Sequence, residues 1–220
     1  MSGLPRYFEI PIALLVLVIT SPAILLAGIL IGITSPGSIL FCQTRVGRSG
    51  RAFTLYKLRT MRPSPGGPQV TVATDSRITW IGRILRKTKI DELPELWNVI
   101  KGDLSLVGPR PEVPRYVNME NPLWREVLRE RPGITDPVTL TLRSEEVFLA
   151  NVEGDSEQYY LKVLLPYKLQ GYLDYLNKRT GWTDLKVLWK TTVAVILPGA
   201  TPLPSSAEIE QAVKLSEPSL

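Results

Sequence analysis

The chain has no histidine and only one cysteine, Cys42, among its 220 residues. The absence of histidine excludes imidazole metal sites, histidine general bases and a Ser–His–Asp triad. One cysteine cannot form a disulfide within the chain or supply a cysteine-ligated zinc site. Catalysis by this chain would therefore rest on carboxylate, lysine, arginine, tyrosine or hydroxyl side chains, with an oxygen-preferring cation such as Mg²⁺.

Charge is also absent from a long N-terminal stretch, because no charged residue occurs between Glu9 and Arg45. Residues 10–33 are almost wholly apolar and numerous enough to cross a bilayer. The run is too long, and its start too weakly basic, for a signal peptide. Thr20-Ser21-Pro22 lies at its middle, where Pro22 predicts a kink and the hydroxyl groups can bond back to the freed carbonyls. The residues alone leave open a kinked spanning helix or a helix that breaks and returns to the same face.

The rest of the chain is basic. The net charge of +5 and the pI near 9.3 predict anionic partners, such as nucleotides, phosphorylated lipids, nucleic acid or an anionic leaflet. Basic residues follow the apolar run with no acid before Asp75, which predicts that the downstream end is cytoplasmic. These residues are Arg45, Arg48, Arg51, Lys57, Arg59 and Arg62.

The strongest candidate site lies in residues 87–112, KTKIDELPELWNVIKGDLSLVGPRPE. Two adjacent carboxylates, Asp91 and Glu92, stand among basic residues. A capping residue at Thr88, apolar residues at helical spacing and a stop at Gly102 predict one helix over this stretch. The start of such a helix would place a nucleophile-capable carboxylate beside backbone N–H groups that bind phosphate.

Arg110, near the end of this stretch, distinguishes a candidate site from ordinary acids in the first turn of a helix. Pro111 pushes Arg110 into extended geometry, and a guanidinium on a rigid bend suits planar phosphate recognition. Taken alone, Asp91 and Glu92 would be unremarkable acids at a helix start. Arg110 beside them favours a phosphate-handling site.

Two strands, 39–43 and 52–60, are predicted to form a hairpin around a turn at 47–50. Lys57 and Arg59 would share one face of the second strand, either as a phosphate clamp or as a solvated surface. Residues 62–74 are rich in proline and glycine and predict a loop.

Further helices are predicted at 79–85, 121–129, 161–176 with a kink at Pro166, and 182–196. The last two carry apolar stripes that either pack the core or lie at a membrane interface, and their tyrosine, tryptophan and lysine residues favour the interface. The acidic residues 143–157 predict a solvated helix and loop. Ser205 and Glu208 predict a short capped helix in the tail.

Residues 85–112 closely resemble the signature of the bacterial sugar transferases, the monotopic phosphoglycosyl transferases, also called polyprenyl-phosphate hexose-1-phosphate transferases. Further matches are Ser21-Pro22, Arg45-Val46-Gly47 and residues 56–61, 131–135 and 184–186. Residues 136–140 depart from the pattern of many relatives, so no sugar- or nucleotide-contacting residue is carried over from that segment.

The resemblance implies a small α/β domain at the cytoplasmic face of the bacterial inner membrane, with several interfacial amphipathic helices. Residues 1–36 would form a re-entrant membrane helix with its break at Ser21-Pro22. Residues 37–198 would form the cytoplasmic catalytic domain, and 199–220 the C-terminal tail.

The resemblance also implies a reaction. A sugar-1-phosphate would pass from a nucleotide sugar, a UDP-sugar by expectation, to polyprenyl phosphate with release of UMP, as the first membrane step of glycan assembly. Asp91 would be the nucleophile of a phosphosugar–aspartyl intermediate, and Glu92 would position Mg²⁺ or handle a proton, so both are expected at the metal. Arg110 would hold phosphate, with Lys57, Arg59 and Arg86 as weaker candidates.

The rival interpretation is a non-catalytic, membrane-tethered module that binds an anion. It accounts for the charge and the apolar run, but gives no reason for the grouping of Asp91, Glu92 and Arg110. A nucleic-acid partner is not expected.

Overall fold

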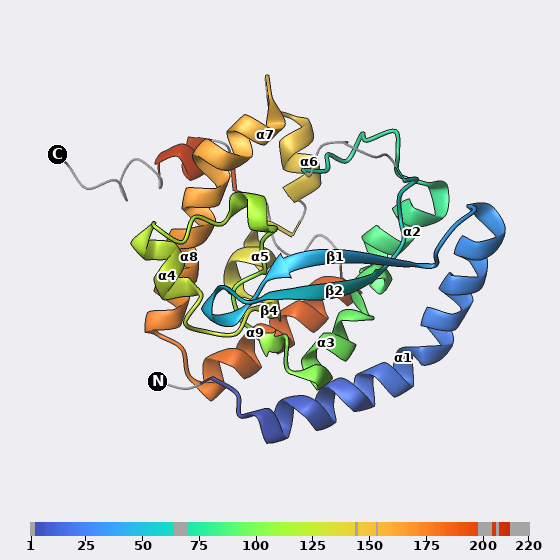
Figure 1. Cartoon of the computed structure of the whole chain (residues 1–220), viewed down its shortest axis with the longest axis horizontal. Helices are drawn as coiled ribbons and strands as arrows, with labels where there is room; N and C mark the ends of the chain where they lie inside the picture. Colours follow the sequence, from blue (N-terminus) through green and yellow to red (C-terminus); the bar gives the residue numbers. More distant parts are fainter. Residues whose placement is uncertain are drawn as a thin grey trace.

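The computed structural model describes residues 3–63, 70–143, 145–152, 154–197, 204–205 and 207–211. Helices surround two small sheets, and a long bent helix wraps around the edge of the domain (Figure 1). The strands are β1 Leu40–Val46, β2 Ala52–Leu58, β3 Ser105–Val107 and β4 Gly133–Thr135. The helices are α1 Arg6–Thr34, α2 Trp80–Thr88, α3 Glu95–Lys101, α4 Pro122–Val127, α5 Pro137–Thr141, α6 Glu145–Ala150, α7 Ser156–Tyr159, α8 Leu165–Asn177 and α9 Gly181–Ile196. This mixture of helix and sheet agrees with the predicted α/β class, although helices dominate.

The predicted hairpin is confirmed. β1 and β2 pair antiparallel from Leu40 opposite Leu58 to Val46 opposite Ala52, so β1 runs three residues beyond its predicted end. The second sheet pairs β3 with β4 in parallel. It brings the two segments that precede Arg110 and follow Arg131 side by side.

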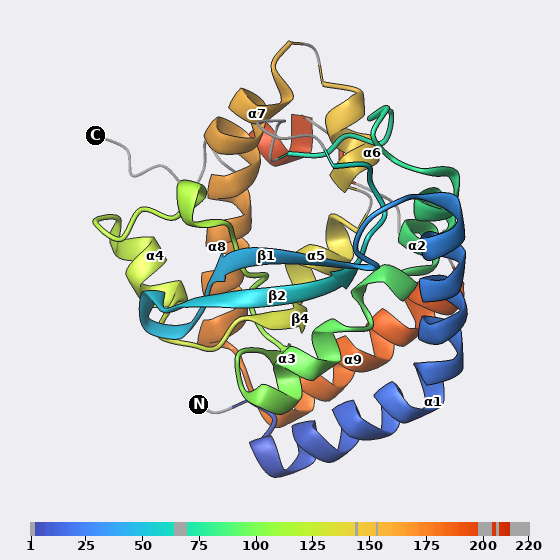
Figure 2. The same cartoon turned by 45° about the vertical axis from the view of Figure 1, so that its right-hand side comes forward.

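The long apolar helix α1 continues without interruption through Ser21 and Pro22. Pro22 cannot donate to Val18, and the Ser21 hydroxyl donates to the Val18 carbonyl instead, at 2.8 Å. The predicted bond-back is therefore confirmed. The expectation of two helices separated by a break is not, because the hydroxyl satisfies the freed carbonyl and the helix bends without unwinding (Figure 2).

Both ends of α1 are attached to the same domain. At the N-terminal end Arg6 donates to the Val99 carbonyl at 2.6 Å, and the buried Glu9 accepts from the Leu106 amide at 2.9 Å. At the C-terminal end the buried residues Ala27 and Ile31 share an apolar cluster with β2 and α2. The two ends of the helix are therefore held by the same domain.

The central stretch folds differently from its prediction. Thr88 does not begin a helix but ends α2, whose N-cap is Thr79. The backbone turns at Lys89, α3 begins only at Glu95, and it ends at Gly102 as predicted. The reason is tertiary: α2 packs against α1 and continues through Thr88, so this residue lies inside one helix and does not cap the start of another.

The two C-terminal helices have opposite environments. A π-helical turn, Tyr160–Leu164, stands where a kink was expected before Pro166, and α8 then buries its apolar face, with Tyr172 fully buried. The interfacial prediction is therefore wrong for α8. On α9, Trp182 is 66% and Trp189 70% exposed, so this helix keeps an uncovered apolar face.

The acidic segment is not simply solvated. Glu145 pairs with Lys168, and Glu146 pairs with Arg86, so two of its carboxylates face the protein. The predicted capped helix in the tail is confirmed, because Ser205 and Glu208 exchange hydrogen bonds at the start of a helix over residues 207–211. The other tail residues and residues 64–69 of the predicted loop lie outside the described part.

Candidate active site

Three segments bring the predicted carboxylates and cations together. Asp91 and Glu92 lie in the 3₁₀ turn Ile90–Glu92 between α2 and α3. Lys57 reaches them from β2, and Arg110 from the loop that follows β3. Asp91 and Glu92 both line one cavity, although neighbouring residues in a 3₁₀ turn diverge by about 120°.

Glu92 is held by two cations. Its Oε1 accepts from Lys57 Nζ at 2.9 Å and from Arg110 Nη2 at 2.7 Å. Burial works against the charged form, but Arg110 and Lys57 outweigh it and hold the pKa of Glu92 well below its usual range. Glu92 therefore carries a permanent negative charge, and Arg110, whose pKa is raised by Glu92, a permanent positive one.

Asp91 is the opposite case. It is buried, and its Oδ1 has no hydrogen-bond partner among the described residues. Burial, with the charge of Glu92, raises the pKa of Asp91 to about 6. An unpartnered carboxylate oxygen that ionises near neutrality suits a nucleophile or a cation ligand.

The site includes a carboxylate that sequence reasoning missed. Glu95 is buried at the start of α3, and its Oε1 lies 3.1 Å from Lys57 Nζ. Burial raises its pKa, and Lys57 opposes that shift. Its spacing of three residues from Glu92, on the same helical face, was the available signal.

The loop that carries Arg110 is fixed through its carbonyl groups, because Pro109 and Pro111 have no amide hydrogen to donate. Arg45 donates to the Pro111 carbonyl at 3.0 Å, and the Gly133 amide donates to that of Pro109 at 3.0 Å. Arg45, from the Arg45-Val46-Gly47 motif, therefore helps to hold the loop that carries Arg110.

Buried ionic groups fix the two ends of the same loop. On the downstream side, Glu112 accepts from Lys168 Nζ at 2.9 Å and from the Tyr160 hydroxyl. On the upstream side, Arg179 donates to the Val107 carbonyl at 2.7 Å. No local sequence signal connects these partners, since they lie 48 to 72 residues apart.

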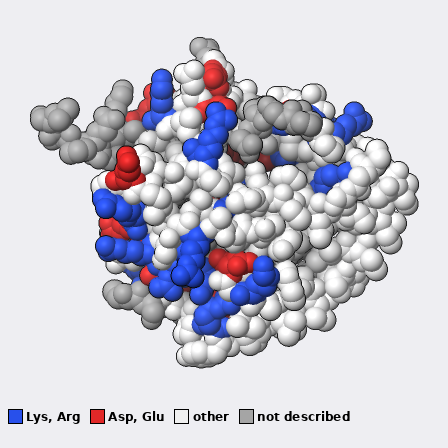
Figure 3. All heavy atoms as spheres, in the orientation of Figure 1, with Lys and Arg blue, Asp and Glu red and all other residues white. Residues whose placement is uncertain are grey.

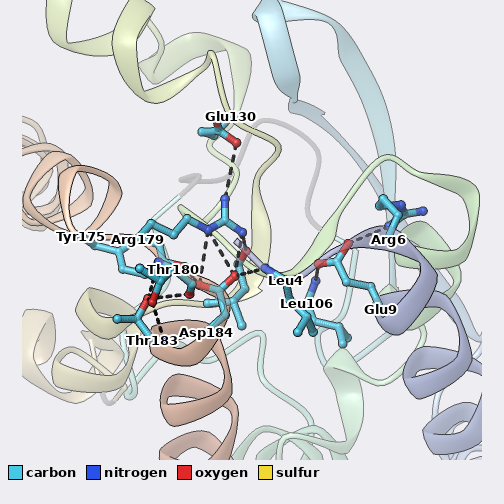
Figure 4. A network of polar contacts seen from close by, with 11 residues as sticks. Leu4, Arg6, Glu9, Leu106, Glu130, Tyr175, Arg179, Thr180, Thr183 and Asp184 are labelled. Carbon is cyan, nitrogen blue, oxygen red and sulfur yellow. Dashed lines mark hydrogen bonds and ion pairs between the residues drawn. The ribbon is translucent and has the colours of Figure 1, made fainter. Parts of the chain in front are cut away.

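Figure 4 shows the network around Arg179. The fully buried Asp184 carboxylate accepts hydrogen bonds from the Arg179 guanidinium and the Tyr175 hydroxyl. It also accepts one from the Leu4 amide, just before α1, at 2.8 Å. Glu130 lies 3.5 Å from the outer guanidinium nitrogen. The network joins α9, the loop before Arg110 and the start of α1.

The other two predicted phosphate ligands are engaged elsewhere. Arg59 is buried and donates to the Ser35 and Pro36 carbonyls, both at 2.6 Å, so it closes the C-terminal end of α1. Arg86 donates to Thr60 at 2.9 Å and pairs with Glu146. Their phosphate roles stay predictions, and in this arrangement both guanidinium groups hold protein oxygens.

An open cavity of about 1550 Å³ contains Asp91, Glu92 and Arg110. Its wall includes Val16 of α1 and Leu188 of α9. This volume exceeds that of a single drug-sized ligand site, roughly 300–1,000 Å³. The cavity is therefore lined by charged side chains, which include both carboxylates, and by apolar side chains of α1 and α9.

The oxygen atoms of the site could hold a hard cation such as Mg²⁺ only in part. No group of three or more His, Cys, Asp or Glu side chains among the described residues could form a complete metal cage. Mg²⁺ commonly uses only one or two carboxylates, together with substrate phosphate and water. The unpartnered Oδ1 of Asp91 fits that pattern, whereas Oε1 of Glu92 already accepts from two cations.

Comparison with known proteins identifies relatives across almost the whole chain. The sequence model of the family described as "bacterial sugar transferase" matches residues 2–198. A UDP-glucose:undecaprenyl-phosphate glucose-1-phosphate transferase of Caulobacter vibrioides is 36% identical over 196 residues, which cover 87% of this chain and 69% of that protein.

Two further relatives differ in length. The UDP-N-acetylgalactosamine-undecaprenyl-phosphate N-acetylgalactosaminephosphotransferase of Aeromonas hydrophila is 32% identical, over 88% of this chain but only 44% of that protein. The exopolysaccharide production protein ExoY of Sinorhizobium fredii is 30% identical, over 87% of this chain and 85% of that protein. On this evidence the chain belongs to the bacterial sugar transferase family.

Proposed function

We propose that this protein transfers a hexose-1-phosphate from a UDP-sugar to a polyprenyl phosphate and releases UMP. The observation that carries the proposal is that two adjacent carboxylates differ in state. Asp91 Oδ1 has no hydrogen-bond partner among the described residues and the group ionises near neutrality, whereas Glu92 is held anionic by Arg110. The names of the relatives support the substrate classes, and they differ in the sugar, glucose in one and N-acetylgalactosamine in another.

In the first half of the reaction an Asp91 oxygen attacks the phosphorus that bears the sugar. The bond from this phosphorus to the UMP oxygen breaks, and UMP leaves with the electron pair of that bond. In the second half an oxygen of the polyprenyl phosphate attacks the same phosphorus, and the bond to Asp91 breaks. The products are polyprenyl diphosphate sugar and the free Asp91 carboxylate.

The surrounding residues have separable tasks. Arg110 supplies a fixed positive charge where phosphate charge develops, and Glu92 holds Arg110 and Lys57 in place. Mg²⁺, held by Asp91 with Glu92 nearby, would supply neutralisation of the phosphate oxygens. The fixed charges cost no reorganisation when the substrates meet.

The exposed apolar surface supports docking on a membrane. α1 contains an 18-residue window of mean hydropathy 2.7, of which only 17% is buried. Figure 3 shows an uncharged lower right-hand margin, over α1. The exposed face of α9, ending at Ile196, adds a second apolar strip. Monomeric soluble proteins rarely expose this much contiguous apolar surface.

We expect α1 to be re-entrant, with both ends on the cytoplasmic face of the bacterial inner membrane, because Glu9 and Ala27 both contact the same domain. In a Cys42→Ser background, a cysteine placed at Ser2 should resist an impermeant thiol reagent added outside intact cells. A cysteine at the exposed Ser38 serves as the matched cytoplasmic control. Strong outside labelling at Ser2 alone would establish a spanning helix instead.

The proposed reaction is tested with a panel of UDP-sugars, purified protein, Mg²⁺ and undecaprenyl phosphate. We expect UMP release and a sugar-bearing lipid from at least one UDP-sugar. The rival, a membrane-tethered anion-binding module, predicts binding without UMP. Binding of every UDP-sugar with no UMP from any of them would favour that rival.

The first half-reaction should depend on pH through Asp91. Since the carboxylate must be ionised to attack and its pKa is about 6, the rate should rise about tenfold per unit below pH 6 and level off above it. Single-turnover UMP release from about pH 5 to pH 8 measures this, with circular dichroism at each pH as the folding control. A rate independent of pH across that range would contradict this assignment.

A further inference from the structure

Most cations around the carboxylates are already engaged. Lys57 and Arg110 both donate to Glu92, and Arg86 pairs with Glu146. A substrate phosphate would have to compete with these carboxylates for each cation. A cation without such a partner would bind phosphate without this competition.

Lys89 meets that condition. It lies between α2 and the 3₁₀ turn, it is exposed, and it lines the same cavity as Asp91 and Glu92. Within the described ranges its ammonium group has neither a hydrogen bond nor an ion pair. Its charge nevertheless acts on the site, because Lys89 is among the groups that lower the pKa of Asp91 and of Glu92, against burial.

The backbone of Lys89 provides an independent observation. Its φ of 58° and ψ of 16° lie in the left-handed region, where a residue with a side chain is strained. α3 ends in the same region on a glycine, Gly102, with φ of 96°. A helix end needs only that backbone geometry, which glycine supplies without strain. The lysine at the end of α2 therefore points to a role for its side chain.

We propose that Lys89 is a substrate-binding residue whose ammonium group takes the phosphate oxygens of the incoming substrate. The inference rests on the proposed function and deepens it. Lys89 precedes Asp91 by two residues and lines the same cavity, so a phosphate at Asp91 can reach it without displacing an existing ion pair. The ligand chemistry is a phosphate, supplied by the diphosphate of the nucleotide sugar or by the polyprenyl phosphate.

Lys89→Gly is the sharpest test, because it removes the charge and relieves the backbone strain together. At saturating undecaprenyl phosphate, the KM for the UDP-sugar should rise roughly tenfold or more, because one charged hydrogen bond is lost. The melting temperature should stay equal or increase. Lys89→Arg should restore most of the lost affinity, and Lys87→Ala, an exposed lysine lining the same cavity, should leave the KM nearly unchanged.

The two phosphate sources are distinguished by a second titration, of undecaprenyl phosphate at saturating UDP-sugar. A rise in KM for the UDP-sugar assigns Lys89 to the diphosphate, and a rise only for the lipid assigns it to the lipid phosphate. Unchanged values in both titrations would overturn the proposal, as would an equal loss in Lys87→Ala or no recovery in Lys89→Arg. Failure of the unmodified protein to release UMP from any UDP-sugar would instead refute the proposed function.

Discussion

Asp91→Asn is expected to abolish UMP release in the absence of lipid and to lower turnover by about 10⁴-fold or more. The amide has nearly the size of the carboxylate but is a poor nucleophile, so the fold should survive. Among the described residues, Asp91 Oδ1 has no hydrogen-bond partner, and the pKa of Asp91 is about 6. By contrast, Glu92 is held by Lys57 and Arg110, and Glu95 Oε1 lies 3.1 Å from Lys57 Nζ. We therefore expect Asp91, and not Glu92, to make the attack.

The measurement uses protein, Mg²⁺ and UDP-sugar labelled in the sugar, without lipid acceptor. The unmodified protein should release up to one equivalent of UMP and retain labelled sugar phosphate on Asp91, because the first half-reaction needs no lipid. Peptide mapping locates the label. Addition of undecaprenyl phosphate should then move the label from protein to lipid.

Glu92→Gln and Arg110→Lys are the matched controls. Each weakens the ionic contact between Glu92 and Arg110 but leaves the nucleophile, so UMP release should slow by roughly 10²–10³-fold while Asp91 still becomes labelled. The competing mechanism is direct attack by the polyprenyl phosphate. An active preparation that gives neither label nor lipid-free UMP would establish that alternative.

Arg179→Met should destabilise the protein by about 3–5 kcal/mol, because it leaves the fully buried Asp184 carboxylate without its cation. The same change frees the Val107 carbonyl, which precedes the Arg110 loop, and loosens the network at the start of α1 (Figure 4). Urea unfolding in detergent, followed by tryptophan fluorescence, measures the loss.

The double variant Arg179→Met, Asp184→Asn provides the control. Its amide oxygen can still accept from the Leu4 amide, and its NH₂ group can donate to the Tyr175 hydroxyl oxygen. The side chain is then no longer an uncompensated buried charge, so part of the stability should return. Thr180→Ala, which removes only the cap of α9, should cost about 1 kcal/mol. A double variant as unstable as Arg179→Met would show that packing, and not charge, sets the loss.

Features with local causes could be predicted from the sequence. The apolar run gave α1, and the serine before Pro22 gave the hydrogen bond to Val18, because both depend on neighbours within one turn. The hairpin and the end of α3 at Gly102 likewise follow from turn residues. The site was found because Asp91, Glu92 and Arg110 lie within 20 residues of one another.

The tertiary structure decided how those residues are used. Sequence spacing made Lys57 and Arg59 equivalent candidates, yet Lys57 reaches Glu92 while Arg59 closes the end of α1. The sequence also could not distinguish the roles of Asp91 and Glu92, because their charge states depend on burial and on cations from other segments.

The residues that hold the Arg110 loop could not be predicted from the sequence either. Leu4 and Asp184, which meet in the network of Arg179, lie 180 residues apart. A residue pattern reports on a helical turn or a strand pair, whereas an ion pair between distant segments exists only once the chain has packed. For this protein the sequence determined which residues are candidates for the chemistry. Packing determined which of these candidates are charged, which are held by other side chains, and which have no partner among the described residues.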